Sequence, residues 1–140
     1  MNIYQLTYQS KSIGELDQDI LNLILEEAIT RNSQEQITGC LVYFNGSFIQ
    51  ILEGAKENVL STYDKILKDK RHHLIDLLWE NDSEKRFFEK WDMGFFSPES
   101  DNEILFVNNY KLLSSFADKS RGATLSFWAS VEKVLDSKLL

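Results

Sequence analysis

The strongest folding signal in this chain is a β-hairpin between Ile37 and Gly54. Two apolar runs in this stretch flank the dipeptide Asn45-Gly46. Asparagine and glycine both tolerate the positive φ angles of a type I′ turn, so this dipeptide between apolar runs is typical of a tight hairpin. The sequence therefore predicts two adjacent antiparallel strands near the middle of the chain, around which the other elements must be arranged.

The second strand of this hairpin carries one unexpected residue, Gln50. Strand alternation places Gln50 on the same face as Phe48 and Leu52. A carboxamide buried on an apolar face costs about 1–3 kcal/mol unless it finds hydrogen-bond partners. We therefore expect a polar group opposite Gln50, which is either another side chain or a ligand.

Composition limits the class of protein. The 140 residues are enough for one domain with a hydrophobic core, and no apolar run approaches the ~18 residues of a membrane span. The formal net charge of −7 argues against non-specific binding to nucleic acid or to anionic membranes, because both need a positive surface. The single cysteine, Cys40, excludes an intrachain disulfide, and the N-terminus lacks the pattern of a signal peptide. We therefore expect a cytoplasmic protein.

Apolar periodicity predicts the remaining elements. Around the hairpin, strands are expected at residues 3–8, 74–79 and 91–95, and helices at residues 17–31, 57–68, 103–116 and 124–135. The resulting β-α-β-β-α-β-β order predicts an α+β, ferredoxin-like sheet with two helices on one face, followed by a C-terminal two-helix extension.

The tail is expected to complete the core. The hairpin strands are apolar on both faces, so the face turned away from the first two helices must be covered. We expect the tail helices either to pack under this face or to pair with another subunit. Pro98 begins the boundary, which gives a domain at residues 1–97 and a helical extension at residues 98–140. The apolar positions of the extension are Leu112, Leu113, Phe116, Leu125, Trp128, Val131 and Leu135.

Three polar side chains fall on inward-facing positions. They are Tyr8 in the first strand, Asn32 at the end of the first helix, and Gln50. Asn32 continues the spacing of four set by Ile20, Ile24 and Ala28. A buried tyrosine, a helix-capping asparagine and an edge-strand glutamine are each ordinary alone. In the predicted topology all three converge beneath the helices, which indicates a binding site.

A positively charged cluster follows the second helix. Its members are Lys65, Lys68, Lys70, Arg71, His72 and His73, with Asp69 among them. The cluster is either a solvated helix terminus that complements the helix dipole or an anion site at the mouth of a cleft. No set of metal ligands with suitable spacing accompanies the two histidines, so we expect no metal site.

These residues together carry a resemblance to a known family. In chain order the matching positions are Tyr8 with Ser10, Asn32 ahead of Ile37-Thr38-Gly39, the run from Phe48 to Gly54, Asp69 with Arg71-His72, and Trp91 with Met93. The combination resembles the BLUF family, which are blue-light sensors that use flavin. The resemblance covers residues 2–96, and the tail is similar to that of short, stand-alone members.

The resemblance implies a role for each matching residue. Tyr8 is expected to give an electron and a proton to the photoexcited flavin. Gln50 is expected to lie between Tyr8 and the flavin and to rearrange there. A carboxamide has both donors and an acceptor, so it can change a network without moving the backbone. The expected flavin contacts are Asn32, Arg31, Lys65, Asp69, Arg71 and His72, and the expected signalling residues are Ser10, Trp91 and Met93.

The resemblance also implies a cofactor and partners. The expected cofactor is FAD, with FMN and riboflavin as alternatives, because the ring contacts are the same for all three. The predicted protein is a sensor and not an enzyme; it forms a homo-oligomer and signals to a separate effector protein. Two alternatives stay open from the residues alone. One is a flavin-free adaptor in which Tyr8, Asn32 and Gln50 satisfy one another, and the other is a small phosphate-ester hydrolase that uses Arg71 and His72.

Overall fold

The computed structural model describes residues 2–14, 16–114 and 121–137. Its elements are β1 (Ile3–Ser12), α1 (Gln18–Gln34), β2 (Thr38–Phe44), β3 (Ser47–Gly54), α2 (Lys56–Leu67), β4 (His72–Ser83), β5 (Gly94–Phe96), α3 (Asp101–Ser114) and α4 (Arg121–Ser137). This order confirms the predicted α+β, ferredoxin-like fold. No helix among the described residues is long and apolar enough to cross a membrane.

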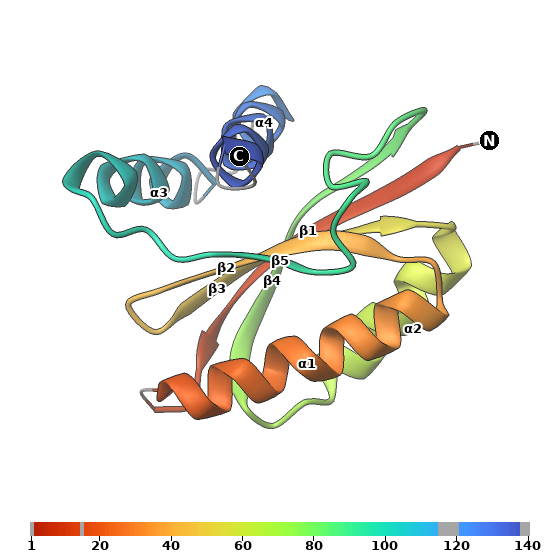
Figure 1. Cartoon of the computed structure of the whole chain (residues 1–140), viewed down its shortest axis with the longest axis horizontal. Coiled ribbons are helices and arrows are strands. Elements are labelled where there is room, and N and C mark those ends of the chain that lie inside the picture. The colour runs from red at the N-terminus through yellow and green to blue at the C-terminus, as the bar shows by residue number, and fades with distance from the viewer. Residues whose placement is uncertain (1, 15, 115–120, 138–140) are drawn as a thin grey trace.

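One five-stranded sheet organises the molecule, in the order β4-β1-β3-β2-β5. β5 runs parallel to β2, and the other neighbouring strands are antiparallel. Figure 1 shows α1 and α2 on one face of the sheet and α3 and α4 on the opposite face. The tail helices therefore cover the second face, as the first of the two expectations for them states.

The predicted hairpin is present and sets the position of Gln50. Asn45 and Gly46 have φ angles of 52° and 76°, which are the positive values that a type I′ turn requires. The register places Gln50 opposite Leu41 in β2 and opposite Tyr8 in β1. Gln50 therefore lies at the centre of the sheet, with a ladder partner on each side.

Each face of the sheet has its own hydrophobic core. The core under α1 and α2, here called the site-side core, contains Tyr4, Leu6, Tyr8, Leu21, Ala28, Ile37, Leu41, Tyr43, Phe48, Leu52, Val59, Ile66 and Met93. The core under α3 and α4, here called the tail-side core, contains Cys40, Val42, Ile49, Ile51, Leu78, Trp79, Phe88, Phe96, Val107, Tyr110, Phe127, Trp128, Val131 and Leu135. Strand alternation divides neighbouring residues between these two cores.

Aromatic side chains fix the tail helices to the sheet. Trp128 in α4 is fully buried, and its Nε1 donates a hydrogen bond to Thr7 Oγ1 in β1 at 3.0 Å. Phe127 stacks on Tyr110 of α3 with ring centroids 4.2 Å apart. The Tyr110 hydroxyl lies 2.9 Å from Thr124 Oγ1, which ties α3 to α4. The extension is thus packed as part of the structure.

The strand boundaries differ from those predicted. β1 and β4 both extend into polar sequence. Residues 9–11 of β1 pair with residues 47–49 of β3, and residues 9–12 of β1 pair with residues 72–76 at the start of β4. The fifth strand begins at Gly94, so Trp91 and Met93 precede it. The strand expected at residues 91–95 would put Trp91, Met93 and Phe95 on one face, and this expectation is wrong. Trp91 packs on the tail-side core, whereas the other two pack on the site-side core.

One apolar position of the tail also differs from the expectation. Leu112 of α3 is 62% exposed, whereas Val107 and Tyr110 are buried against α4. The buried stripe of α3 therefore runs through Val107 and Tyr110, so Leu112 falls on the outer side. Phe116 lies outside the described residues. In α4 the predicted positions Trp128, Val131 and Leu135 are buried.

Candidate functional site

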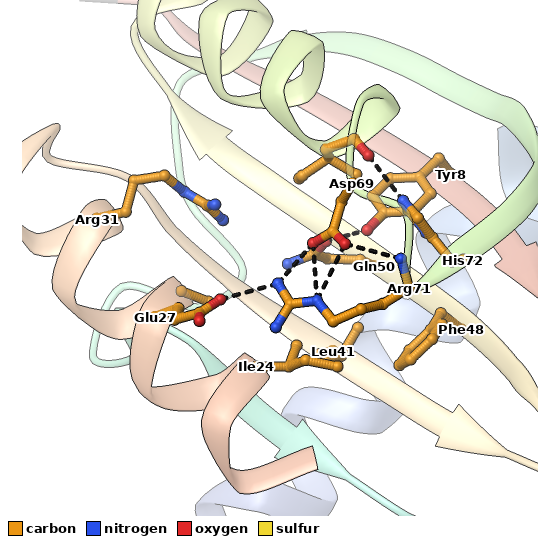
Figure 2. A pocket seen from close by; sticks show the side chains of 12 residues that line it. Tyr8, Ile24, Glu27, Arg31, Leu41, Phe48, Gln50, Asp69, Arg71 and His72 are labelled. Atoms are coloured by element: carbon orange, nitrogen blue, oxygen red, sulfur yellow. Dashed lines mark hydrogen bonds and ion pairs between the residues drawn. The ribbon is translucent and has the colours of Figure 1, made fainter. Parts of the chain in front are cut away.

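A pocket opens on the face of the sheet that α1 and α2 cover, as Figure 2 shows. Side chains of β1, β2 and β3 form its floor. α1 forms one wall, and the end of α2 with the start of β4 forms the other. The lining residues are Tyr8, Ile24, Glu27, Ala28, Arg31, Leu41, Phe48, Gln50, Ile66, Asp69, Arg71 and His72.

Tyr8 and Gln50 lie side by side in the floor because β1 and β3 pair with these two residues in register. The Tyr8 hydroxyl donates a hydrogen bond to Gln50 Oε1, and Gln50 Nε2 donates to Met93 Sδ at 3.4 Å. Tyr8 is 3% exposed, and burial raises the pKa of its phenol, which therefore keeps its proton at neutral pH. A hydrogen-bond chain thus runs from a phenol through a carboxamide to a thioether.

Residues 91–93, here called the bridging segment, are bonded to three different elements. Gly39 N in β2 donates to Trp91 O at 3.1 Å. Asn32 Nδ2 in α1 donates to Asp92 O at 2.8 Å. Met93 Sδ accepts the hydrogen bond from Gln50 Nε2 in β3 that is described above. The position of this segment therefore depends on the side chains of α1 and β3 as well as on the sheet backbone.

The bridging segment also passes from one core to the other. Trp91 packs against the tail-side core, whereas Met93 belongs to the site-side core. Gly94 follows this segment and allows its backbone to lie close to α4. An added Cβ at Gly94 would lie 3.0 Å from Leu135 Cδ1 in α4 and 3.5 Å from the Trp91 ring. One short segment therefore lies between the floor of the pocket and α4.

Two carboxylates hold Arg71 at the mouth of the pocket (Figure 2). Asp69 accepts from Arg71 Nε at 3.0 Å and from Nη2 at 2.6 Å. Glu27 in α1 accepts from the same Nη2 at 2.8 Å. Hydrogen bonding by Arg71 holds the pKa of Asp69 below its usual value, and the bond to Asp69 raises the pKa of Arg71. Asp69 and Arg71 are therefore both charged at neutral pH.

His72 is fixed by contacts on both ring nitrogens. Its Nε2 lies 2.7 Å from Ile66 O, which can only accept, so this nitrogen carries the hydrogen. Its Nδ1 lies 2.8 Å from Ser10 Oγ and accepts from that hydroxyl when the ring is neutral. The ring meets Tyr8 edge-on with centroids 6.3 Å apart. Ser10 and His72 thus brace the wall of the pocket next to the phenol.

Most of the residues that the sequence predicts for the site line this pocket. Lys65 does not: it is exposed on α2 and is absent from the lining. Asn32 is fully buried next to the lining. Glu27 was not predicted, because on the exposed side of α1 nothing distinguishes it from Glu26. Its one signal in the sequence is the spacing of four from Arg31.

Comparison with known proteins decides the family. Residues 3–94 match the BLUF family model, described as sensors of blue-light using FAD. The chain belongs to the BLUF family. The match spans every pocket residue and the bridging segment, and it confirms the family that the resemblance predicts. BLUF domains are sensors, so the matched region is a sensing domain and not an enzyme.

Solved BLUF structures share this fold over nearly the whole chain. The photo-activated state of BlsA aligns with a TM-score of 0.78 and 28% identity, covering 94% of this chain and 95% of that chain. The dark-state structure of BlrB, a BLUF protein, aligns with a TM-score of 0.72 and 22% identity, covering 93% and 97%. These alignments extend beyond residue 94, where the family match ends, because they cover 93–94% of this chain.

Curated relatives match over a shorter stretch. Photoactivated adenylate cyclase subunit beta from Euglena gracilis is 42% identical over 67 residues, which are 48% of this chain and 8% of that protein. The alpha subunit from the same organism is 45% identical over 67 residues and 7% of its length. The chain therefore spans only a small part of the length of these relatives.

Unpaired atoms beside the pocket fit the heterocycle that BLUF domains use. Asn32 Oδ1 and Arg31 Nε are buried and have no hydrogen-bond partner among the described residues. Buried polar groups are normally paired, so a missing acceptor and a missing donor at one end of α1 indicate a bound group. The imide edge of a flavin ring carries both acceptors and a donor. The residues present therefore suit a flavin ring.

The two alternative functions fit these contacts less well. In a self-satisfied adaptor, Asn32 would bond to Tyr8 or Gln50, but it bonds to Asp92 O and keeps its oxygen unpaired. In a hydrolase, Arg71 and His72 would be directed at a substrate. Arg71 is instead bound by two carboxylates, and both nitrogens of His72 are engaged. The family match also favours the sensor.

Proposed function

We propose that this BLUF chain detects blue light through flavin held in the pocket, with Tyr8 as the electron donor and Gln50 as the switching group. The observation that carries the proposal is the chain of hydrogen bonds from Tyr8 through Gln50 to Met93. It lies in the floor of the pocket and ends on the bridging segment. Two hydrogen bonds thus join Tyr8 in the pocket floor to the bridging segment.

The chain's own side chains divide the work of binding. Asn32 and Arg31 would bind the polar edge of the ring, since their buried polar atoms lack partners among the described residues. Leu41, Phe48 and Ile66 would exclude water from the ring, and they are at most 7% exposed. Asp69, Arg71 and His72 would lie beside the ring and its side chain. FAD is the cofactor named for the family, and FMN and riboflavin carry the same ring.

The photochemistry begins at Tyr8. Flavin, when bound, supplies the absorption of blue light and an excited state that accepts an electron. The Tyr8 phenol gives up an electron, and its proton already has an acceptor in contact, Gln50 Oε1. Because the phenol is protonated at neutral pH, its oxidation would release both an electron and a proton. The later return of both restores Tyr8, so the cycle leaves the chain chemically unchanged.

Rearrangement of Gln50 converts this transfer into a movement. When the carboxamide turns, its Nε2 faces Tyr8 and its oxygen faces Met93. A thioether sulfur cannot donate a hydrogen bond, so the contact that Gln50 Nε2 makes with Met93 Sδ is lost. Met93 is 4% exposed and has to shift within a packed core. The bridging segment therefore has two arrangements, which Gln50 selects.

The signal passes from the flavin-binding face of the sheet to the face that the tail helices cover. We assign residues 1–97 to the flavin-binding unit and residues 98–140 to the extension that carries the signal outward. Gly94 follows the bridging segment and lies close to α4, because a Cβ added there would lie 3.0 Å from Leu135 Cδ1. The receiver is a separate effector protein, reached through a homo-oligomer of this chain. Relatives named as light-regulated adenylyl cyclase and photoactivated adenylate cyclase support an effector as the target of BLUF signals.

Tyr8→Phe tests the proposal, since it removes the hydroxyl and keeps the ring. The variant is expected to bind flavin with an affinity within about threefold of the original chain. Under blue light it should lose the small, reversible red shift of the flavin bands, because no phenol can donate. The measurement is the visible absorption spectrum in darkness, during illumination and during recovery.

Tyr43→Phe is the matched control. Tyr43 is also a buried tyrosine of the site-side core, but its hydroxyl has no partner among the described residues. This variant should keep the full red shift. A normal shift in Tyr8→Phe would remove Tyr8 from the assigned role, and absence of flavin uptake by the original chain would overturn the function as a whole.

A further inference from the structure

The pocket is buried at its floor and charged at its mouth. Tyr8, Leu41 and Gln50 in the floor are at most 4% exposed. At the mouth, the side chain of Glu27 is 49% exposed and that of Arg71 is 34% exposed. A flavin ring therefore belongs in the interior, and a charged tail attached to it belongs at the mouth. The residues at the mouth are the ones that a phosphate group would meet.

Glu27 is the only cross-pocket partner of Arg71 among the described contacts. Asp69 lies two residues before Arg71 and holds the guanidinium from the same turn. Glu27 instead comes from α1, on the opposite wall, and reaches Arg71 Nη2 at 2.8 Å (Figure 2). The Glu27–Arg71 ion pair thus joins the two walls across the opening. A ligand that passes between the walls must first break it.

Glu27 also sets the charge of the mouth. The lining contains two arginines, Arg31 and Arg71, and two carboxylates, Glu27 and Asp69, so their charges cancel. Without Glu27 the same four positions would carry one net positive charge. A phosphate needs the guanidinium that Glu27 occupies, and it is repelled by the Glu27 carboxylate. Riboflavin carries no phosphate and experiences only the barrier of the ion pair.

We propose that Glu27 is a gate residue of the flavin pocket, which slows flavin exchange and disfavours phosphate-bearing flavins relative to riboflavin. The proposal rests on the proposed function, in that the pocket takes flavin. Glu27 acts in two ways. As a partner of Arg71 it holds the mouth closed, and as a negative charge it opposes the phosphate of FMN or FAD. Only the second effect depends on the ligand's charge.

The test is the rate of flavin association with the flavin-free full chain. Stopped-flow quenching of flavin fluorescence would follow riboflavin, FMN and FAD binding to the original chain, to Glu27→Gln and to the control Glu26→Gln. Glu26 is the neighbouring exposed carboxylate of α1 and does not line the pocket. Each rate is measured at low salt and at about 1 M salt, where the screening length falls to roughly 3 Å.

Glu27→Gln should accelerate riboflavin association about two- to fivefold, the range that a partly exposed ion pair spans. FMN and FAD should gain about threefold more than riboflavin at low salt, and this extra gain should disappear at high salt because it comes from charge. Glu26→Gln should match the original chain for all three ligands. The substitution is polar for polar at an exposed position, so the fold is retained.

Two results would overturn the role of Glu27. One is a Glu27→Gln variant with the same association rates as Glu26→Gln, and the other is an equal gain for riboflavin and FMN at low salt. Both leave flavin binding itself intact, so they count against the gate alone. Failure of the original chain to quench any of the three flavins would instead overturn the proposed function.

Discussion

The two faces of the sheet bury polar groups in different ways. On the tail side most of these groups are paired: Thr7 accepts from Trp128, and Glu53 accepts from Gln5 and from the backbone amides of Phe87 and Phe88. The exception is Trp91 Nε1, which is buried without a partner among the described residues. On the site side, Asn32 Oδ1, Arg31 Nε and the Tyr43 hydroxyl are buried without partners among the described residues. Apart from Trp91, the polar groups named on the tail face satisfy one another, whereas on the site face Asn32 and Arg31 keep hydrogen-bonding capacity for a ligand.

The largest effect should come from the tail face. Trp128→Ala removes a fully buried ring and its hydrogen bond to Thr7, so it should lower the free energy of unfolding by about 3–5 kcal/mol. Flavin affinity should change less than about threefold, because the ring lies on the opposite face from the pocket. Chemical denaturation and flavin titration measure the two quantities.

Leu112→Ala is the control for that comparison. Leu112 lies in the other tail helix and is 62% exposed, so its truncation should cost less than about 0.5 kcal/mol. If Trp128→Ala abolished flavin binding in a chain that remained folded, the two faces would not be independent, and the contrast between them would be lost.

An intermediate effect is expected at Glu53, which lies where the tail face meets the segment after β4. Its carboxylate accepts from Phe87 N at 2.7 Å and from Phe88 N at 2.9 Å. Glu53→Gln replaces one acceptor with an NH₂ group, which leaves one backbone N–H unpaired. We expect the free energy of unfolding to fall by about 1–3 kcal/mol.

Thermal or denaturant unfolding measures this loss, with Glu57→Gln as the matched control. Glu57 is an exposed glutamate of α2, and its substitution should stay within about 0.5 kcal/mol of the original chain. Equal stabilities of the two variants would show that the buried network on the tail face contributes nothing, contrary to the comparison above.

The smallest effect is expected at the mouth of the pocket and depends on pH. The hydrogen bonds from Arg71 lower the pKa of Asp69 in the folded chain. A lowered pKa stabilises the fold above the unfolded pKa, near 3.9 for aspartate, and this stabilisation is lost as the pH falls through the folded pKa. Asp69→Asn should therefore cost less than about 1 kcal/mol at pH 7, and this cost should vanish in acid.

Unfolding curves of the flavin-free chain at pH 7 and at pH values below 4 measure this difference. Asp64→Asn, at an exposed position of α2, is the control and should cost nothing at either pH. A cost of Asp69→Asn that grew as the pH fell would contradict the assigned ion pair, since protonation should remove the difference between the two side chains.

The sequence predicted the parts of this molecule that depend on local rules. Asn45-Gly46 predicted the hairpin, and strand parity placed Gln50 on the face that carries the pocket. The spacing of four along α1 placed Asn32 inside, where it is fully buried, although Ile20 at the start of the same stripe is 36% exposed. These predictions succeeded because backbone turn preferences and side-chain alternation act within one element.

Features that depend on contacts between elements were not predictable in the same way. Trp91 and Met93 lie ahead of β5, where strand parity does not apply, so packing on two different cores decides their directions. Glu27 gains its partner only because α1 lies across the pocket from Arg71. The polar start and end of β4 became strand because β1 offered ladder partners, and no apolar pattern reports that pairing.

The bond from Asn32 Nδ2 to Asp92 O has a thermodynamic consequence. One end of the carboxamide holds the bridging segment, and under the proposed function the other end holds the flavin. Coupling between two binding events is reciprocal. An effector protein that binds the bridging segment more tightly when flavin is present must therefore tighten flavin binding by the same factor. The receiver of the light signal would then also be a determinant of how firmly the chain keeps its pigment.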